Sequence, residues 1–145
     1  MASELKVNTL TGVSTAGSIA VTAEGNSTTT NLQQGLAKAW TNFNGTSTIA
    51  HRDSFNCGSL TDRGTGEYDI NFTTNMGNAN HCPTANTNGD SGTNNFQSLT
   101  FAPTGTSHSS MTGNSTSTTS LGSFSSSSGY ADAALNFISV HGDLA

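Results

Sequence analysis

The sequence predicts an all-β protein with an N-terminal extended arm, one short helix and a β-sandwich or jelly-roll-like knob. Three observations favour this class. Thr, Ser, Asn and Gly supply more than half of the 145 residues, and this composition favours short strands joined by tight turns. Charged residues make up only 9% of the chain, less than a disordered acidic chain would carry. Short apolar–polar alternations separated by turn signals recur along the chain, which is typical of β-sandwiches and barrels.

Residues 1–29 are predicted to form an anchoring arm. Segments 4–10 (ELKVNTL) and 18–22 (SIAVT) alternate in the manner of strands. The arm has too little apolar area to fold alone, yet its apolar residues are regularly placed. Since exposed strands seek pairing partners, we expect the arm to order on other arms or on a neighbouring protein. The residues expected to take part are Leu5, Val7, Leu10, Val13, Ile19 and Val21.

Residues 30–40 (TNLQQGLAKAW) differ from the rest of the chain and predict a short helix. Thr30 or Asn31 can cap it, because a side-chain oxygen there can accept from a free backbone N–H. A helix of about ten residues is marginal in isolation, so its single apolar face needs a partner. Three copies could pack this face around a threefold axis as a homotrimer, or one copy could cap a sheet of its own domain. The predicted face comprises Leu32, Leu36, Ala39 and Trp40.

Residues 41–145 are predicted to form the β-rich knob. The clearest hairpin joins residues 60–63 to residues 67–72 through the turn GTG. In its second strand, Tyr68, Ile70 and Phe72 share one face. Residues 104–120 are a Ser/Thr/Gly-rich stretch that predicts a loop or an irregular edge. Further strands are predicted over 49–55, with Ile49 and Phe55 inward and His51 as a further inward candidate, and over 96–101, 121–124 and 134–140.

The order of several segments resembles a known group of proteins. SELKVNTLTGVSTAGSIAVTAEG, LQQGLAKAWTNFNGT, the RDSFN stretch and EYDINFTTNMGNAN follow one another. In this order they are similar to tail-fibre and related virion surface proteins of marine bacteriophages, over roughly residues 3 to 80. The resemblance implies a virion location, contacts with tail, baseplate or major capsid proteins, and frequent trimers. The Ser-rich stretch at residues 104–128 departs most from the family.

Motifs that could carry catalysis are weak. The run HRDSFN resembles a fragment of the kinase catalytic loop, but its Asn follows the Asp by three residues rather than five. His51, Asp53 and Ser54 are the right types for a nucleophile triad, yet neighbours on one strand point to opposite faces. Paired acids for glycoside hydrolysis would need a cleft. The candidate acids are Glu67, Asp69 and Asp90. We therefore predict no catalytic site.

Metal, cofactor, nucleic-acid and membrane binding are likewise not expected. No two of the four histidines have ligand spacing, although three copies of one His could hold a metal on a threefold axis. Four Lys and Arg are too scattered to follow a phosphate backbone. No apolar run approaches the roughly 18 residues of a membrane span. Cys57 and Cys82 are interpreted as two reduced thiols, with pairing left open.

Two polar loops, NMGNANH and TNGDSG, are the predicted places for recognition. Their amides and hydroxyls suit a carbohydrate or another polar cell-surface ligand, although plain solvated turns have the same composition. The residues singled out are Asn75, Asn78, Asn80, Asn88 and Asp90.

Together these expectations describe a non-enzymatic phage virion protein, a trimeric tail-fibre or knob component displayed for host attachment. The first alternative is a capsid decoration protein that stabilises the shell. The second, from another class, is a small glycan-degrading hydrolase.

Overall fold

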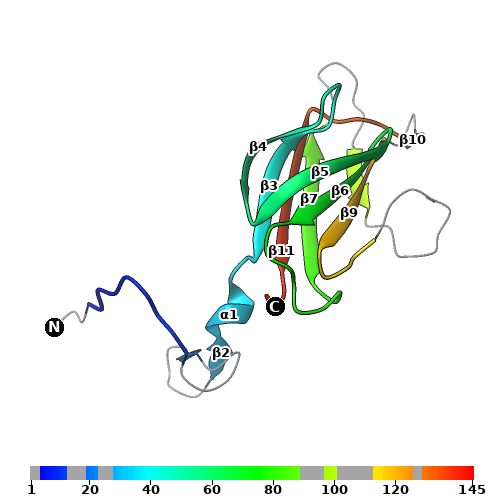
Figure 1. Cartoon of the computed structure of the whole chain (residues 1–145). Helices are drawn as coiled ribbons and strands as arrows, with labels where there is room; N and C mark the ends of the chain where they lie inside the picture. Colours follow the sequence, from blue (N-terminus) through cyan, green and yellow to red (C-terminus); the bar gives the residue numbers. More distant parts are fainter. Residues whose placement is uncertain (1–3, 13–18, 23–27, 89–96, 101–112, 126–128) are drawn as a thin grey trace. The chain divides into compact units, whose positions relative to one another are not determined.

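The computed structural model describes residues 4–12, 19–22, 28–88, 97–100, 113–125 and 129–145. The chain divides into two compact units, Met1–Leu36 and Ala37–Ala145, and each is described by itself. Strands dominate the described residues, and a single four-residue helix, α1 (Leu32–Gly35), accompanies them (Figure 1). The predicted all-β class is therefore confirmed.

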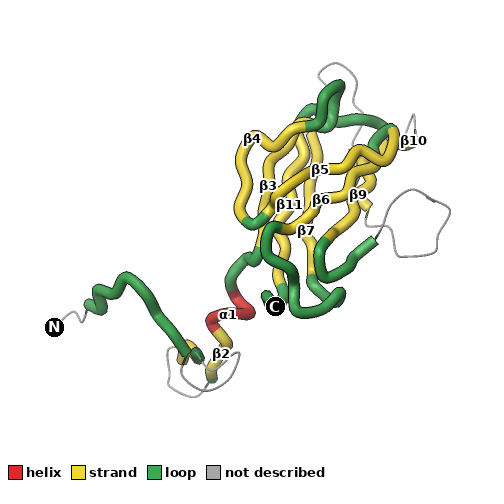
Figure 2. The backbone as a smooth tube through the Cα atoms, in the orientation of Figure 1, coloured by secondary structure: helices red, strands yellow, loops and turns green. Residues whose placement is uncertain are grey.

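The second unit contains two antiparallel sheets. One has the strand order β4-β3-β11-β7, from β4 (Ala50–Phe55), β3 (Ala39–Asn44), β11 (Leu135–His141) and β7 (Cys82–Asn88). The other has the order β10-β9-β6-β5, and β8 also pairs with β9. Figure 2 shows how β3 and β11, far apart in sequence, run side by side. The strands of this second sheet are β5 (Cys57–Gly64), β6 (Glu67–Phe72), β8 (Gln97–Thr100), β9 (Thr118–Ser125) and β10 (Gly129–Tyr130).

Alternate side chains of the central strands point into the space between the two sheets and fill it. Every second residue of β3 and β11 is buried, and the residues between them are half-buried or exposed. The Phe43 and Tyr68 rings meet edge to face, with centroids 5.3 Å apart. Because the core joins side chains of both sheets, the unit is a sandwich. Its core cluster comprises Ala39, Phe43, Cys57, Tyr68, Ile70, Phe72, Met76, Leu121, Ile138 and Val140.

The chain passes from one sheet to the other at Asn56, between β4 and β5. Asn56 has φ of 55°, in the left-handed region that Asn adopts more readily than most residues. Its Nδ2 donates to the carbonyl oxygens of Lys38 at 3.0 Å and of Thr74 at 3.1 Å. Its Oδ1 accepts from the Thr74 N–H at 2.6 Å. One amide therefore fixes three segments at this corner.

A second polar clamp lies around the Tyr68 hydroxyl. This buried hydroxyl lies 3.0 Å from both the Gly45 carbonyl oxygen and Asp132 Oδ1. Asp132 Oδ1 also accepts from the Gly66 N–H at 2.6 Å. A Cβ at residue 45 would lie 2.5 Å from the Tyr68 hydroxyl, so the close approach requires glycine there. The predicted hairpin turn and the segment before β11 are thus tied together.

The first unit holds little secondary structure. β1 (Ala20–Thr22) and β2 (Thr29–Asn31) pair antiparallel, and the Leu32 N–H donates to the Ile19 carbonyl oxygen at 2.9 Å. Residues 4–12 contain no strand, so the prediction of a strand over 4–10 is wrong for the single chain. A strand needs a hydrogen-bonded neighbour, and the described part of this unit offers none to that segment.

The helix is shorter than predicted. Asn31 Oδ1 caps it by accepting from the Gln34 N–H at 3.1 Å, as expected, but α1 ends at Gly35 and Leu36 is already extended. Ala39 and Trp40 instead begin β3, because β3 pairs with both β4 and β11 there. Among the described residues no helix is long and apolar enough to cross a membrane.

We predict that the Asn56 corner is sensitive to substitution. Asn56→Ala should lower the free energy of unfolding by about 3 kcal/mol, because it removes three hydrogen bonds and forces Ala into the left-handed region. Asn56→Gly removes the same bonds without that strain and should cost less. Denaturant titration of both variants measures the difference. Equal losses would contradict the strain argument, and unchanged stability would contradict the clamp.

The two thiols should differ sharply in reactivity. Both are free in the structure, with Cys57 buried and Cys82 exposed. Burial raises the pKa of the Cys57 thiol to about 11, so the nucleophilic thiolate is scarce at neutral pH. Iodoacetamide should therefore label one site on the folded protein and two in denaturant, as read by mass spectrometry. The Cys82→Ser variant should remain unlabelled when folded; labelling of that variant would show Cys57 to be accessible.

Candidate functional site

The outer face of the sheet β4-β3-β11-β7 combines aromatic and amide side chains. The strand register sets them in two rows, each crossing the four strands. The first row is Phe55, Trp40, Ser139 and Thr84, and the second is Asp53, Asn42, Phe137 and Asn86. We call these eight residues the aromatic face.

Strand alternation determines which residues reach this face. In β3, Ala39, Thr41 and Phe43 are buried, so Trp40 and Asn42 must point the other way. In β11, Ile138 is buried and its neighbours Phe137 and Ser139 are more exposed. Core packing thus turns one aromatic ring outward on each of two adjacent strands.

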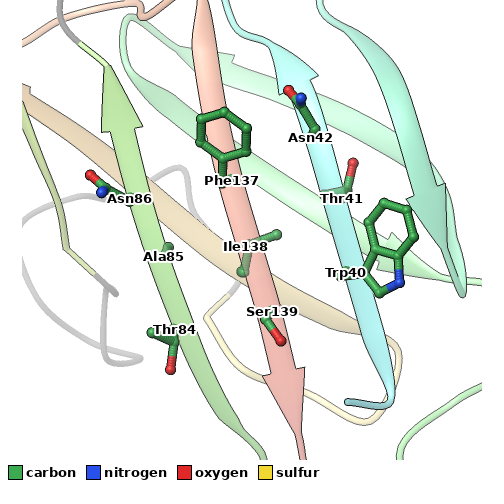
Figure 3. Close-up of a pocket in the computed structure, with 9 residues that line it drawn as sticks. All are labelled: Trp40, Thr41, Asn42, Thr84, Ala85, Asn86, Phe137, Ile138 and Ser139. Atoms are coloured by element: carbon green, nitrogen blue, oxygen red, sulfur yellow. The ribbon is translucent and has the colours of Figure 1, made fainter.

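A depression of about 490 Å³ lies on the aromatic face. Figure 3 shows Trp40 on β3 and Phe137 on β11 standing diagonally across it, with Ser139 further along β11. Its size falls within the 300–1,000 Å³ typical of small-molecule sites. The residues that line it are Trp40, Thr41, Asn42, Thr84, Ala85, Asn86, Phe137, Ile138 and Ser139.

The three aromatic rings of this face are open to solvent. Trp40 is 37%, Phe137 41% and Phe55 51% exposed. The prediction that Phe55 points inward is therefore wrong; its partner across the strands is the outward Trp40. Solitary exposed apolar residues are ordinary, but three on neighbouring strands form a patch that calls for a function.

The polar groups of the aromatic face are almost all uncharged. Asp53 is the only ionisable residue among the eight, and its Oδ1 accepts from the Ser54 N–H at 2.9 Å. The nearby Arg52 guanidinium donates to the Ala134 carbonyl oxygen at 3.1 Å. Asn42 Oδ1 is buried and has no hydrogen-bond partner among the described residues. Because such an acceptor costs stability, the fold alone does not explain this amide.

The residues of the predicted helix face are not brought together. Leu32 and Leu36 belong to the first unit, where Leu36 is exposed. Ala39 is buried in the core of the second unit, and Trp40 belongs to the aromatic face. Sequence reasoning noticed Trp40 but assigned it to a helix. The alternation of residues 40–43 is visible in the sequence, and in the structure it continues back to Ala39 as part of β3.

The arm residues are mostly exposed in the single chain. Leu5, Val7, Leu10 and Val21 are all open to solvent, Ile19 contributes a carbonyl oxygen to the Leu32 N–H, and Val13 lies outside the described residues.

The predicted recognition loops are partly occupied by internal hydrogen bonds. Asn78 Oδ1 accepts from the Asn80 N–H at 2.7 Å, and the Asn75 carbonyl oxygen accepts from the Ala145 N–H at 3.0 Å. Asn88 ends β7 two residues beyond Asn86, so it extends the outward side of that strand. Asp90 lies outside the described residues.

The acids and histidines considered for catalysis have other partners. Asp69 is buried, and its Oδ2 lies 2.8 Å from both Nε and Nη2 of Arg63; Ser120 Oγ donates to its other oxygen. His51 Nδ1 lies 2.7 Å from the Thr41 hydroxyl, and the Ser54 hydroxyl donates to the Cys57 carbonyl oxygen at 3.5 Å. Among the residues that the structure describes, no three His, Cys, Asp or Glu side chains are grouped to hold a metal.

The chain was compared with protein families, curated proteins and solved structures. No protein-family model, no curated protein and no solved structure gives a significant match to this chain.

Two histidines, the buried His81 and the half-buried His51, predict a pH dependence. Burial lowers the pKa of His81, whose two ring nitrogens have no hydrogen-bond partner among the described residues, and burial also lowers the pKa of His51. The unfolded chain therefore binds more protons once the pH falls below about 6.5, the unperturbed value, and the free energy of unfolding decreases there.

Denaturant titrations between pH 7.5 and 5.5 should show this decrease, since His is the main side chain that titrates in that range. A variant carrying His51→Gln and His81→Gln should show a flatter profile, with His141→Gln as the matched control. A wild-type profile as flat as the double variant would contradict the buried-histidine explanation.

Proposed function

We propose that this chain is a non-enzymatic virion surface protein of the bacteriophage tail-fibre kind, anchored by residues 1–36 and displaying the sandwich for host attachment. The observation that carries the proposal is the division into a folded sandwich and an N-terminal unit whose large apolar side chains are mostly exposed. The resemblance over residues 3 to 80 supports the same role.

The first unit needs a partner to become stable. Leu5 is 79% exposed, and Val7, Leu10 and Leu36 are each more than half exposed. An isolated two-stranded ribbon such as β1-β2 is at best marginal in water. Two further copies of the arm would cover these side chains and give the expected homotrimer. A neighbouring virion protein would then hold the trimer in the particle.

The internal partners of the polar clusters support a role without catalysis. Asp69 is paired with Arg63 and Ser120, and the aromatic face carries one carboxylate, Asp53, whereas glycoside hydrolysis uses two. The hydrolase alternative therefore has less support than display.

The capsid decoration alternative uses the same exposed arm with a different partner. A tail fibre would be present as a few trimers at the tail, and a decoration protein as many copies across the shell. Virion imaging with copy counting separates these two roles.

We expect the arm to determine assembly. The full chain should be trimeric by light scattering at micromolar concentration, because its exposed apolar residues become buried between copies. Deleting residues 2–36 should leave a folded monomeric sandwich that no longer enters particles. A monomeric full chain would contradict the trimer, and an unfolded sandwich after the deletion would contradict the two-part architecture.

A finer variant tests the apolar contacts themselves. Replacing Leu5, Val7 and Leu10 together by Ser should weaken the trimer, whereas Asn8→Ser with Thr9→Ser, in the same segment, should not. Equal behaviour of the two variants would show that the apolar side chains do not hold the assembly.

A further inference from the structure

We propose that the aromatic face binds a neutral oligosaccharide, with Trp40 and Phe137 as stacking platforms. The inference rests on the proposed function for its biological setting, since this ligand would be the host determinant that the displayed sandwich recognises. Binding to the purified chain does not depend on that setting.

The two rings are spaced for a sugar chain. Trp40 pairs with Ser139 and Phe137 pairs with Asn42, so the rings are diagonal neighbours, with Cα atoms roughly 7–8 Å apart. Phe55 stands directly opposite Trp40 on the next strand. The apolar C–H face of a pyranose ring packs on an aromatic face, which carries the negative part of the ring quadrupole. Three rings in a path across the strands favour a chain of sugars over a single one.

Polar side chains lie beside the aromatic rings, where they can form hydrogen bonds with the hydroxyl groups of a bound sugar. Asn42 and Asn86 flank Phe137 in its row, and Ser139 and Thr84 continue the row of Trp40. Each amide offers both a donor and an acceptor, and each hydroxyl can serve as either. Neighbouring sugar hydroxyls need this mixture. Asn42 Oδ1 is buried, so a ligand on this face would bind the donor side of that amide, and Asn86, Ser139 and Thr84 would supply the acceptors.

Charge and size select the occupant. The face carries one carboxylate, Asp53, and the adjacent Arg52 guanidinium, which donates to the Ala134 carbonyl oxygen, offsets it. With no surplus of positive charge to attract a sulfated, phosphorylated or carboxylated ligand, a neutral ligand fits better. The aromatic face is two rows of residues across four strands, and the usual spacings between strands and along a strand give it an area on the order of 250 Å². A stable protein–protein interface buries about 800 Å² per partner, so the face alone is too small to hold a second copy of this chain.

The single tryptophan of the chain gives a direct readout of this site. The full chain is titrated with neutral hexasaccharides of glucose, mannose and galactose while Trp40 fluorescence is followed. At least one should cause a saturable change, and its sulfated form should bind more weakly. Phe137→Ala should weaken binding about tenfold, and Asn42→Ala should weaken it by a smaller factor.

Phe124→Ala is the matched control, because Phe124 is 38% exposed and lies on the other sheet. It should leave binding unchanged, and thermal melting should show that all variants are folded. The proposal is overturned if none of the three neutral sugars changes the fluorescence, or if Phe124→Ala weakens binding as much as Phe137→Ala. It is also overturned if Phe137→Ala changes the oligomeric state, because the face would then be a subunit contact.

Particle incorporation separates this proposal from the proposed function. A phage carrying Phe137→Ala should incorporate the protein normally and adsorb less to its host. Absence of the protein from particles would refute the virion role, while sugar binding by the purified chain would still stand.

Discussion

The contact between Phe43 and Tyr68 is the constraint on which the rest of the sandwich depends. These two rings join β3 of one sheet to β6 of the other, edge to face at 5.3 Å. The hydroxyl of Tyr68 then holds Gly45 and Asp132, so the same residue fixes both the core and the loops at one end. Burial raises the pKa of this hydroxyl, which keeps it protonated as a hydrogen-bond donor. A chain with so few large apolar residues concentrates its packing in a small number of such contacts.

The outward aromatic residues follow from the same constraint. Once Phe43 is buried, the two-residue period of β3 sends Trp40 to the opposite side. Burial of Ile138 does the same for Phe137 on β11. A one-residue change of register would exchange the core with the aromatic face. The face is therefore as well defined in position as the core, although its side chains are open to solvent.

The sequence was sufficient for elements whose signals are local. The hairpin of β5 and β6, the inward set of Tyr68, Ile70 and Phe72, and the last strand were all predicted correctly. The start of β3 was not predicted correctly. Ala-Lys-Ala at residues 37–39 is rich in good helix formers, but the pairing of β3 with β4 and β11 overrode that preference. Phe55 was placed on the wrong side because alternation alone does not say which face of a strand is buried.

The aromatic face could not be predicted as a site. It joins Trp40 to Ser139 and Asn86 to Phe137, residues that are far apart in the chain and meet only through strand order. Polar loops were the more visible signal, since clusters of Asn stand out in a sequence. The structure shows that part of this polarity, as in Asn78, serves the turns themselves.

The protein therefore exposes two apolar surfaces of different chemistry, and the difference separates their roles. The arm exposes aliphatic side chains on a unit with little secondary structure, where burial against another polypeptide would supply the area needed to offset the ordering of the chain. The aromatic face exposes rings separated by amides and hydroxyls on a rigid sheet, so a ligand binds there without ordering the backbone. If the arm assembles three chains, three such faces act together, and linkage raises the effective affinity of sites that are individually weak. Under this scheme, assembly through the arm is what makes a small, open sugar site sufficient for attachment.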